Sequence, residues 1–206
     1  MKKGHLKRHF FVAVALPDDA KRDLSAQLDE TQRHPGWEWK DSEDYHISLA
    51  FPGALDDKRF KEIKTILSQV DMQSFKVQLE GVSTFFKEQN RRKNNKHVVW
   101  ARPDSESDYN LRRLNYKIAQ TLKACGYTIG KRDQQPHVTI VKPPVTETEA
   151  VEDYVESRGT LDSVAWDCTS FVLYETLQPN DPDHPSNQNG EGSRFREVAV
   201  FNLSPS

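Results

Sequence analysis

Two short segments of the sequence repeat one pattern, and this repetition constrains the fold more than any other feature. The segments read His46-Ile47-Ser48-Leu49 and His137-Val138-Thr139-Ile140. Side chains alternate between the two faces of a strand, so the histidine and the hydroxyl of each segment project together while the apolar residues enter the core. A proline and a predicted helix start follow each segment, near Leu55 and Thr146, which indicates two lobes related by duplication.

Hydrophobic periodicity predicts a mixed order of strands and helices. Strands are expected at 10–16, 45–51, 75–86, 97–101, 136–141, 164–177 and 195–203. Helices are expected from Pro17 to about His34, over 55–70 and 105–125, and over 146–155, where Thr146 and Glu149 match a capping box. Several strand pairs follow one another directly, so we expect an α+β fold with antiparallel sheets and helices packed on one side.

Two predicted loops are polar. Lys87–Lys96 holds a basic cluster that includes Arg91, Arg92, Lys93 and Lys96. It is either a solvated hairpin loop or a local patch that binds an RNA backbone. Residues 178–192 are rich in turn formers and are expected to be a mobile loop, within which His184-Pro185-Ser186 lacks flanking apolar residues and is interpreted as a chance match.

Length, charge and cysteine content limit the class of protein. The 206 residues suit a single domain over 1–206, and a formal charge of -2 gives no overall positive field to draw the chain onto polyanions. Cys125 and Cys168 form no CxxC pair, so a reducing cytoplasm is expected rather than a disulfide framework or a zinc knuckle. The apolar run at 10–16 ends at Pro17, well short of the roughly 20 apolar residues of a membrane span, so no membrane association is expected.

The paired histidines and hydroxyls suit chemistry at a phosphodiester. Histidines with an ordinary pKa of about 6.5 can serve as one base and one acid at neutral pH. Two hydroxyl donors can bind the non-bridging oxygens, where negative charge develops. No HxH or HExxH cluster, P-loop or dinucleotide glycine fingerprint occurs in the sequence, so we predict no metal and no cofactor. Phe51 and Trp100 are candidates for stacking on a base, with core packing as the alternative for each.

The paired HxS/T segments resemble the motifs of the two-histidine (2H) phosphoesterase superfamily. The opening run Phe10–Pro17 resembles the start of its RNA 2′,3′-cyclic phosphodiesterase branch, historically called 2′-5′ RNA ligases, and the resemblance extends from about Phe10 to Leu203. It implies a bilobal, pseudo-symmetric α+β fold in which a pair of antiparallel sheets surrounds a central cleft, with helices on the outer faces. It also implies metal-free hydrolysis of a 2′,3′-cyclic phosphate to a 2′-phosphate.

Carried over residue by residue, the resemblance makes His46 and His137 the catalytic pair and Ser48 and Thr139 the hydroxyls that hold the phosphate. Related enzymes use the second histidine to activate water and the first to protonate the departing 3′ oxygen, which makes His137 the base and His46 the acid. The branch often has an arginine after its second motif. This chain has Lys142 there, which can replace the charge but not a bidentate guanidinium contact.

We therefore expect a monomeric, cytoplasmic, metal-free phosphodiesterase that acts on an RNA 2′,3′-cyclic phosphate end or on a small cyclic or 2′-5′-linked nucleotide. A third possibility is ATP-independent 2′-5′ ligation in the same site, which needs no different residues. The alternative is a module of the same fold that binds a nucleotide or an RNA end with little catalysis. Two intact histidines favour the enzyme, because a binding module needs hydrogen-bond donors but no titrating pair.

Overall fold

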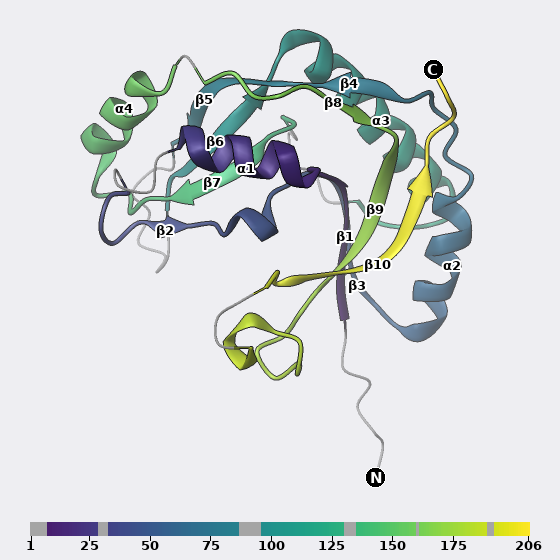
Figure 1. Cartoon of the computed structure of the whole chain (residues 1–206). Coiled ribbons are helices and arrows are strands. Elements are labelled where there is room, and N and C mark those ends of the chain that lie inside the picture. Colours follow the sequence, from purple (N-terminus) through teal and green to yellow (C-terminus); the bar gives the residue numbers. More distant parts are fainter. Residues whose placement is uncertain (1–7, 29–32, 87–95, 130–134, 160, 189–191) are drawn as a thin grey trace.

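The computed structural model describes residues 8–28, 33–86, 96–129, 135–159, 161–188 and 192–206. Across this part of the chain most strands belong to one antiparallel sheet (Figure 1). Its path runs β10 (Phe195–Asn202), β9 (Ser170–Thr176), β1 (Arg8–Ala15), β3 (His46–Leu55), β7 (Val138–Lys142), β6 (Val98–Pro103) and β5 (Leu79–Phe85), and β2 (Glu38–Trp39) pairs with β7. The expected α+β fold with antiparallel strands is confirmed.

The sheet consists of two halves that meet between β3 and β7. The β3–β7 ladder contains one pair of residues, Ile47 opposite Val138. Each of these residues directly follows the histidine of its own segment. An antiparallel pair between equivalent residues is what a local twofold axis requires, so the two histidine segments are related by pseudo-symmetry at the junction of the two lobes.

The predicted strands 75–86 and 164–177 are each divided into two strands that belong to different sheets. β4 (Phe75–Val77) and β8 (Trp166–Cys168) form a small separate sheet, whereas β5 and β9 join the large one. The breaks fall where backbone groups bond elsewhere. The Gln78 amide donates to Ser107 Oγ at 2.9 Å, and the Thr169 carbonyl accepts from the Leu203 amide at 2.8 Å.

Four helices accompany the strands in the described residues: α1 (Asp18–Gln27), α2 (Asp57–Leu67), α3 (Ser105–Ala124) and α4 (Thr148–Ser157). Aspartate caps begin α2 and α3, since Asp56 accepts from the Arg59 amide and Asp104 from the Ser107 amide. The capping box predicted at 146 and 149 is wrong. Helix α4 begins after Glu147, and no side chain caps it.

Helix α3 forms the largest helical part of the core. Its buried face, Leu111, Leu114, Ile118 and Leu122, lies against β3 and α2. Helix α4 packs against β5, and α1 is tied to the nearby 158–164 segment because the Gln27 side chain donates to the Asp162 carbonyl at 2.8 Å. Helices thus support both half-sheets. Within the residues described, none of the helices has the length and apolar character needed to span a membrane.

Candidate active site

A cleft of about 880 Å³ opens where the two half-sheets meet. Six of the seven candidate residues line it: His46, Ser48, Phe51, His137, Thr139 and Lys142. The seventh, Trp100, does not. The two histidine segments, although far apart in sequence, therefore contribute to one cavity, because β3 and β7 lie next to each other in the sheet.

Each histidine is oriented by a backbone carbonyl two residues before it. His46 Nδ1 lies 2.7 Å from the Asp44 carbonyl oxygen, and His137 Nδ1 lies 2.7 Å from the Gln135 carbonyl oxygen. A carbonyl only accepts, so Nδ1 carries the proton and donates in both rings. In the neutral form Nε2 is then the basic nitrogen. In the protonated form Nε2 becomes a donor, so both rings can exchange a proton with the cleft through the same atom.

His46 is surrounded by aromatic rings. The centroid of its ring lies 4.9 Å from that of Phe11, 5.0 Å from that of Phe195 and 6.3 Å from that of Tyr174. Burial among these rings lowers the pKa of His46 to about 4, even though the Asp44 carbonyl favours the protonated form. His46 is therefore neutral at pH 7 unless a nearby anion offsets the burial.

His137 has a smaller aromatic surrounding on the other lobe. Its ring centroid lies 5.2 Å from that of Phe85 and 5.6 Å from that of Trp100. Burial lowers the pKa of His137 as well, against the opposing effect of the Gln135 carbonyl. Trp100 is only 2% exposed and stacks on Phe85, so the structure places it beneath the histidine rather than at the cleft surface.

A β-bulge in β3 turns Phe51 towards the cleft. Consecutive residues of β1 lie opposite Ala50 and Ser48, which leaves Leu49 as an extra residue in β3. Leu49 and Ala50 are both 0% exposed, and the alternation of faces resumes one residue out of step. Strict alternation from His46 would instead direct Ala50 into the cleft and Phe51 into the core.

The same irregularity occurs in β7 and turns Lys142 towards the cleft. Consecutive residues of β6 lie opposite Val141 and Thr139, which leaves Ile140 as the extra residue. Ile140 and Val141 are both 0% exposed, and Lys142 lines the cleft. Each lobe therefore sends the residue five positions after its histidine into the cleft, an aromatic ring from one lobe and a cation from the other.

Asp44 connects the first histidine to an arginine that the sequence analysis did not identify. Its buried carboxylate accepts from Ser193 Oγ at 2.9 Å, from the Arg194 amide at 2.8 Å and from Arg194 Nε at 2.6 Å. Arg194 lines the cleft. One residue thus orients His46 through its backbone carbonyl and Arg194 through its side chain.

Lys40 is a further cation in the cleft wall. Its Nζ donates to Glu38 at 2.6 Å, and Glu38 also accepts from Lys96 at 2.8 Å. Although burial opposes ionisation of Glu38, these two hydrogen bonds lower its pKa to about 2. Burial lowers the pKa of Lys142, and the positive charge of Lys40 lowers it further. On the β7 side of the cleft, the three lysines thus outnumber the one carboxylate, that of Glu38.

Comparison with known proteins identifies the family. A family model described as the 2'-5' RNA ligase superfamily matches residues 16–180, which is most of the chain. The chain belongs to this superfamily. The match includes both histidine segments and both bulges, whereas Arg194 and His184 of the cleft lining fall outside it.

Curated relatives of this superfamily member carry the name RNA 2',3'-cyclic phosphodiesterase. The one from Methanocaldococcus jannaschii is 25% identical over 174 residues, which cover 84% of this chain and 94% of the relative. The one from Archaeoglobus fulgidus is 31% identical over 130 residues, which cover 63% of this chain and 69% of the relative. The one from Geobacillus stearothermophilus is 27% identical over 201 residues, or 90% of this chain, but the chain spans only 61% of that relative's length.

Solved structures share the fold. LigT from E. coli in its apo form has a TM-score of 0.67 at 15% identity, with 96% of this chain and 98% of LigT covered. A protein from Thermus thermophilus, TT0787, has a TM-score of 0.65 at 18% identity, with 96% of this chain and 98% of TT0787 covered. The bilobal architecture of this superfamily member is therefore common to proteins of very different sequence.

His184, interpreted from the sequence as a chance match, also lines the cleft of this superfamily member. The described part of the polar loop folds back towards the histidines, and Arg196 holds it by ion pairs of 2.9 Å to both Asp181 and Asp183. His184 Nδ1 accepts from the Ser186 amide at 3.2 Å. No local sequence signal could have placed it there, because its position depends on how the whole loop folds. The mobility expected for this loop stays a prediction. Of the predicted basic loop, residues 87–95 lie outside the described part of the chain.

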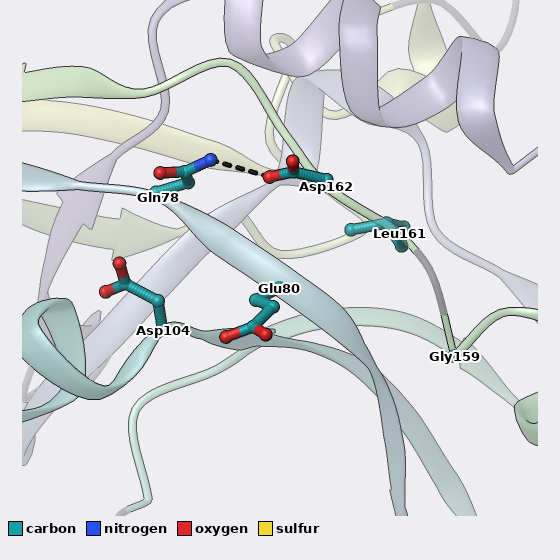
Figure 2. A pocket seen from close by; sticks show the side chains of 6 residues that line it. All are labelled: Gln78, Glu80, Asp104, Gly159, Leu161 and Asp162. Carbon is teal, nitrogen blue, oxygen red and sulfur yellow. Dashed lines mark hydrogen bonds between the residues drawn. The ribbon is translucent and has the colours of Figure 1, made fainter.

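A second, smaller hollow of about 350 Å³ shares no lining residue with the histidine cleft (Figure 2). Its polar side chains include Glu80, Asp104 and Asp162, and Gln78 donates to Asp162 at 2.6 Å. Asp104 is already engaged as the cap of α3. Among the residues described, no group of three or more histidine, cysteine or acidic side chains is arranged to hold a metal ion.

Proposed function

We propose that this chain hydrolyses the 2′,3′-cyclic phosphate of an RNA end or a small nucleotide to a 2′-phosphate, with His46 and His137 as the acid–base pair. The observation that carries the proposal is that both rings line one cleft with Nδ1 bound to a carbonyl, which reserves Nε2 of each for proton transfer. The names of the curated relatives support this choice of substrate.

The proposed reaction is an attack of water on the cyclic phosphorus. One neutral histidine accepts a proton from the water at Nε2 while the new P–O bond forms. The other histidine, protonated, donates from Nε2 to the 3′ oxygen as the P–O3′ bond breaks. Following the family resemblance, we propose His137 as the base and His46 as the acid. The products are a 2′-phosphate and a 3′-hydroxyl. In 2′-5′ ligation the same two proton transfers occur in the same direction, with the 5′-hydroxyl of an RNA in place of water as the nucleophile.

Ser48 and Thr139 are proposed to bind the two non-bridging oxygens. Each lies two residues after a histidine on the same face of its strand, and both line the cleft. A hydroxyl fixed in this way donates to an oxygen whose charge increases in the transition state. The pseudo-symmetric placement of the two hydroxyls suits the two equivalent oxygens of a phosphodiester.

Burial disfavours the protonated form of His46, which is the form that its proposed role as the acid requires. Because burial lowers the pKa of His46 to about 4, the ring acquires its proton only when the negative charge of the substrate lies close to it. The pH profile should show this coupling. The alkaline limb of kcat, which reports the complex, should lie at higher pH than the alkaline limb of kcat/KM, which reports the free enzyme.

The decisive test is incubation of the purified protein with a nucleoside 2′,3′-cyclic phosphate. We expect hydrolysis, and we expect His46→Ala and His137→Ala each to reduce turnover by at least about a hundredfold with unchanged melting temperatures. His9→Ala is the matched control, because His9 is an exposed residue of β1 outside the cleft lining. Full activity of either cleft variant would remove that histidine from the mechanism, and binding without hydrolysis by the wild type would identify a binding module instead.

A further inference from the structure

The cleft carries more positive charge than a single cyclic phosphate requires. A cyclic phosphodiester has one negative charge. Three cations line the cleft, Lys40, Lys142 and Arg194, against one carboxylate, that of Asp44. This concentration of cations is local, because the whole chain has a formal charge of -2. Like charges placed close together indicate a site for more than one anionic group.

Within the described part of the chain, Arg194 has a fixed orientation and free donor atoms on its guanidinium. Its backbone amide and Nε are bound to the Asp44 carboxylate, which fixes the direction of the side chain. Neither of its terminal Nη atoms donates to any residue that the structure describes, and the side chain is 39% exposed. Two adjacent Nη donors of fixed geometry are the arrangement that binds phosphate oxygens in pairs.

Lys142 completes the positive wall from the other lobe. The bulge at Ile140 directs its side chain into the cleft, and its Nζ has no partner among the residues described. After burial, the charges of Lys40 and Arg194 both contribute to lowering the pKa of Lys142, so these groups lie near one another. Glu38 offsets them only in part, since it is already bound to Lys40 and Lys96.

We propose that Lys40, Lys142 and Arg194 form a second phosphate subsite beside the histidine pair, which takes a phosphate group of the substrate other than the cyclic one. This inference rests on the proposed function and narrows its substrate class. The second phosphate is either the internucleotide phosphodiester that precedes an RNA end or a 5′-phosphate on a single nucleotide. The cleft has room for it, since about 880 Å³ is near the upper end of the roughly 300–1,000 Å³ typical of ligand pockets.

The test compares three substrates with the same cyclic end. These are a nucleoside 2′,3′-cyclic phosphate, the same nucleotide with a 5′-phosphate, and a dinucleotide that ends in a 2′,3′-cyclic phosphate. We expect at least one of the two larger substrates to have a kcat/KM about tenfold higher or more than the smallest one. A higher kcat/KM for the 5′-phosphorylated nucleotide would indicate a site for a terminal phosphate, and a higher kcat/KM for the dinucleotide would indicate a site for an internucleotide phosphate.

The variants assign the gain to the subsite. Lys142→Gln should reduce the preference for a second phosphate to near unity, and Arg194→Lys, which keeps the charge beside Asp44 but loses the paired donors, should reduce it in part. Lys58→Gln is the matched control, because Lys58 is an exposed cation of α2 that does not line the cleft. Equal kcat/KM for all three substrates, or an equal loss on all three in Lys142→Gln, would overturn the inference.

A failure of the proposed function is distinguishable from a failure of the subsite. If the protein hydrolyses none of the three substrates, the proposed function is wrong, and calorimetry then tests the subsite alone. A nucleoside 2′,5′-bisphosphate should bind about tenfold more tightly than the 2′-monophosphate, and Lys142→Gln should abolish the difference. Equal affinities would show that there is no second phosphate subsite.

Discussion

The substitution Asp44→Asn tests how the cleft is assembled, because it changes one atom at the point where the η2 turn (Ser42–Asp44) meets the segment that carries Arg194. The asparagine oxygen can still accept from Ser193 Oγ and from the Arg194 amide. Its amide nitrogen, however, would face Arg194 Nε, which is also a donor, so the 2.6 Å ion pair is replaced by a repulsive contact.

The size of the effect follows from burial. Breaking a buried ion pair costs about 3–5 kcal/mol, because the remaining charge is left unpaired. The Asp44 side chain is 3% exposed but that of Arg194 is 39% exposed, so water can hydrate the guanidinium in the variant. We therefore expect Asp44→Asn to lower the free energy of unfolding by about 2–3 kcal/mol, measured by urea denaturation.

Asp41→Asn is the matched control for this experiment. Asp41 precedes the same turn, and its carboxylate accepts from the Glu43 amide at the surface. Asparagine caps a turn about as well as aspartate, so this variant should stay within about 0.5 kcal/mol of the wild type. If Asp44→Asn and Asp41→Asn unfold at the same urea concentration as the wild type, the Asp44 carboxylate does not hold the Arg194 segment in place.

Other predictions concern the histidine segments. The burial that lowers the pKa of His46 to about 4 should make the fold lose up to about 3 kcal/mol of stability as the pH falls from about 6.5 to 4, since the unfolded chain binds the proton more readily. Urea titrations across this range should show a flatter dependence in His46→Gln, and an unchanged slope would contradict the burial argument. Ser48→Ala and Thr139→Val should each raise the activation barrier for turnover by at most about 2.7–4 kcal/mol. Each should lose less activity than the histidine variants but more than a surface variant, and both should keep the wild-type melting temperature. Ile47→Ser, at a site 0% exposed, should instead be less stable by about 3 kcal/mol or more while the cleft residues stay intact, and a wild-type melt for this variant would mean that the strand faces are reversed. Hydrolysis should persist in EDTA, because the proposed proton transfers use only side chains; loss of activity that a divalent ion restores would refute this.

The sequence could predict the two histidine segments because strand alternation is a local rule. The period of two alone places the histidine and the hydroxyl of each segment on one face of the strand, His46 with Ser48 and His137 with Thr139. The repetition also indicated two lobes related by duplication, and the structure adds that the two strands are neighbours in one sheet. The pair Ile47–Val138 is where the structure realises this.

The bulges could not be predicted from the sequence, because the apolar runs read the same with or without an extra residue. Phe51 was a candidate because an aromatic ring can stack on a base, and Lys142 because of the family resemblance, yet strict alternation would have directed both away from the cleft. The register with β1 and β6 decides their direction, and this register is set by pairing between distant segments.

Long-range contacts account for what the sequence analysis missed. Arg194 is identified only when its bond to Asp44, 150 residues earlier, is known. His184 was interpreted as a chance match because its immediate neighbours are polar. In the structure it nevertheless lines the cleft. Trp100 was considered for stacking on a base, but its packing beneath His137 depends on the pairing of β6 with β7.

The paired bulges have a consequence for the polarity with which a substrate lies in the cleft. Around the pseudo-twofold axis the imidazoles, hydroxyls and carbonyl contacts are nearly interchangeable, so they give a cyclic phosphate no preferred direction. Phe51 and Lys142 occupy equivalent bulge positions but have opposite chemistry, one apolar and one charged. In the proposed mechanism, Phe51 and Lys142 therefore add to the asymmetry that the Asp44–Arg194 ion pair already creates on the His46 side, and together these groups favour one orientation of the substrate between the two histidines.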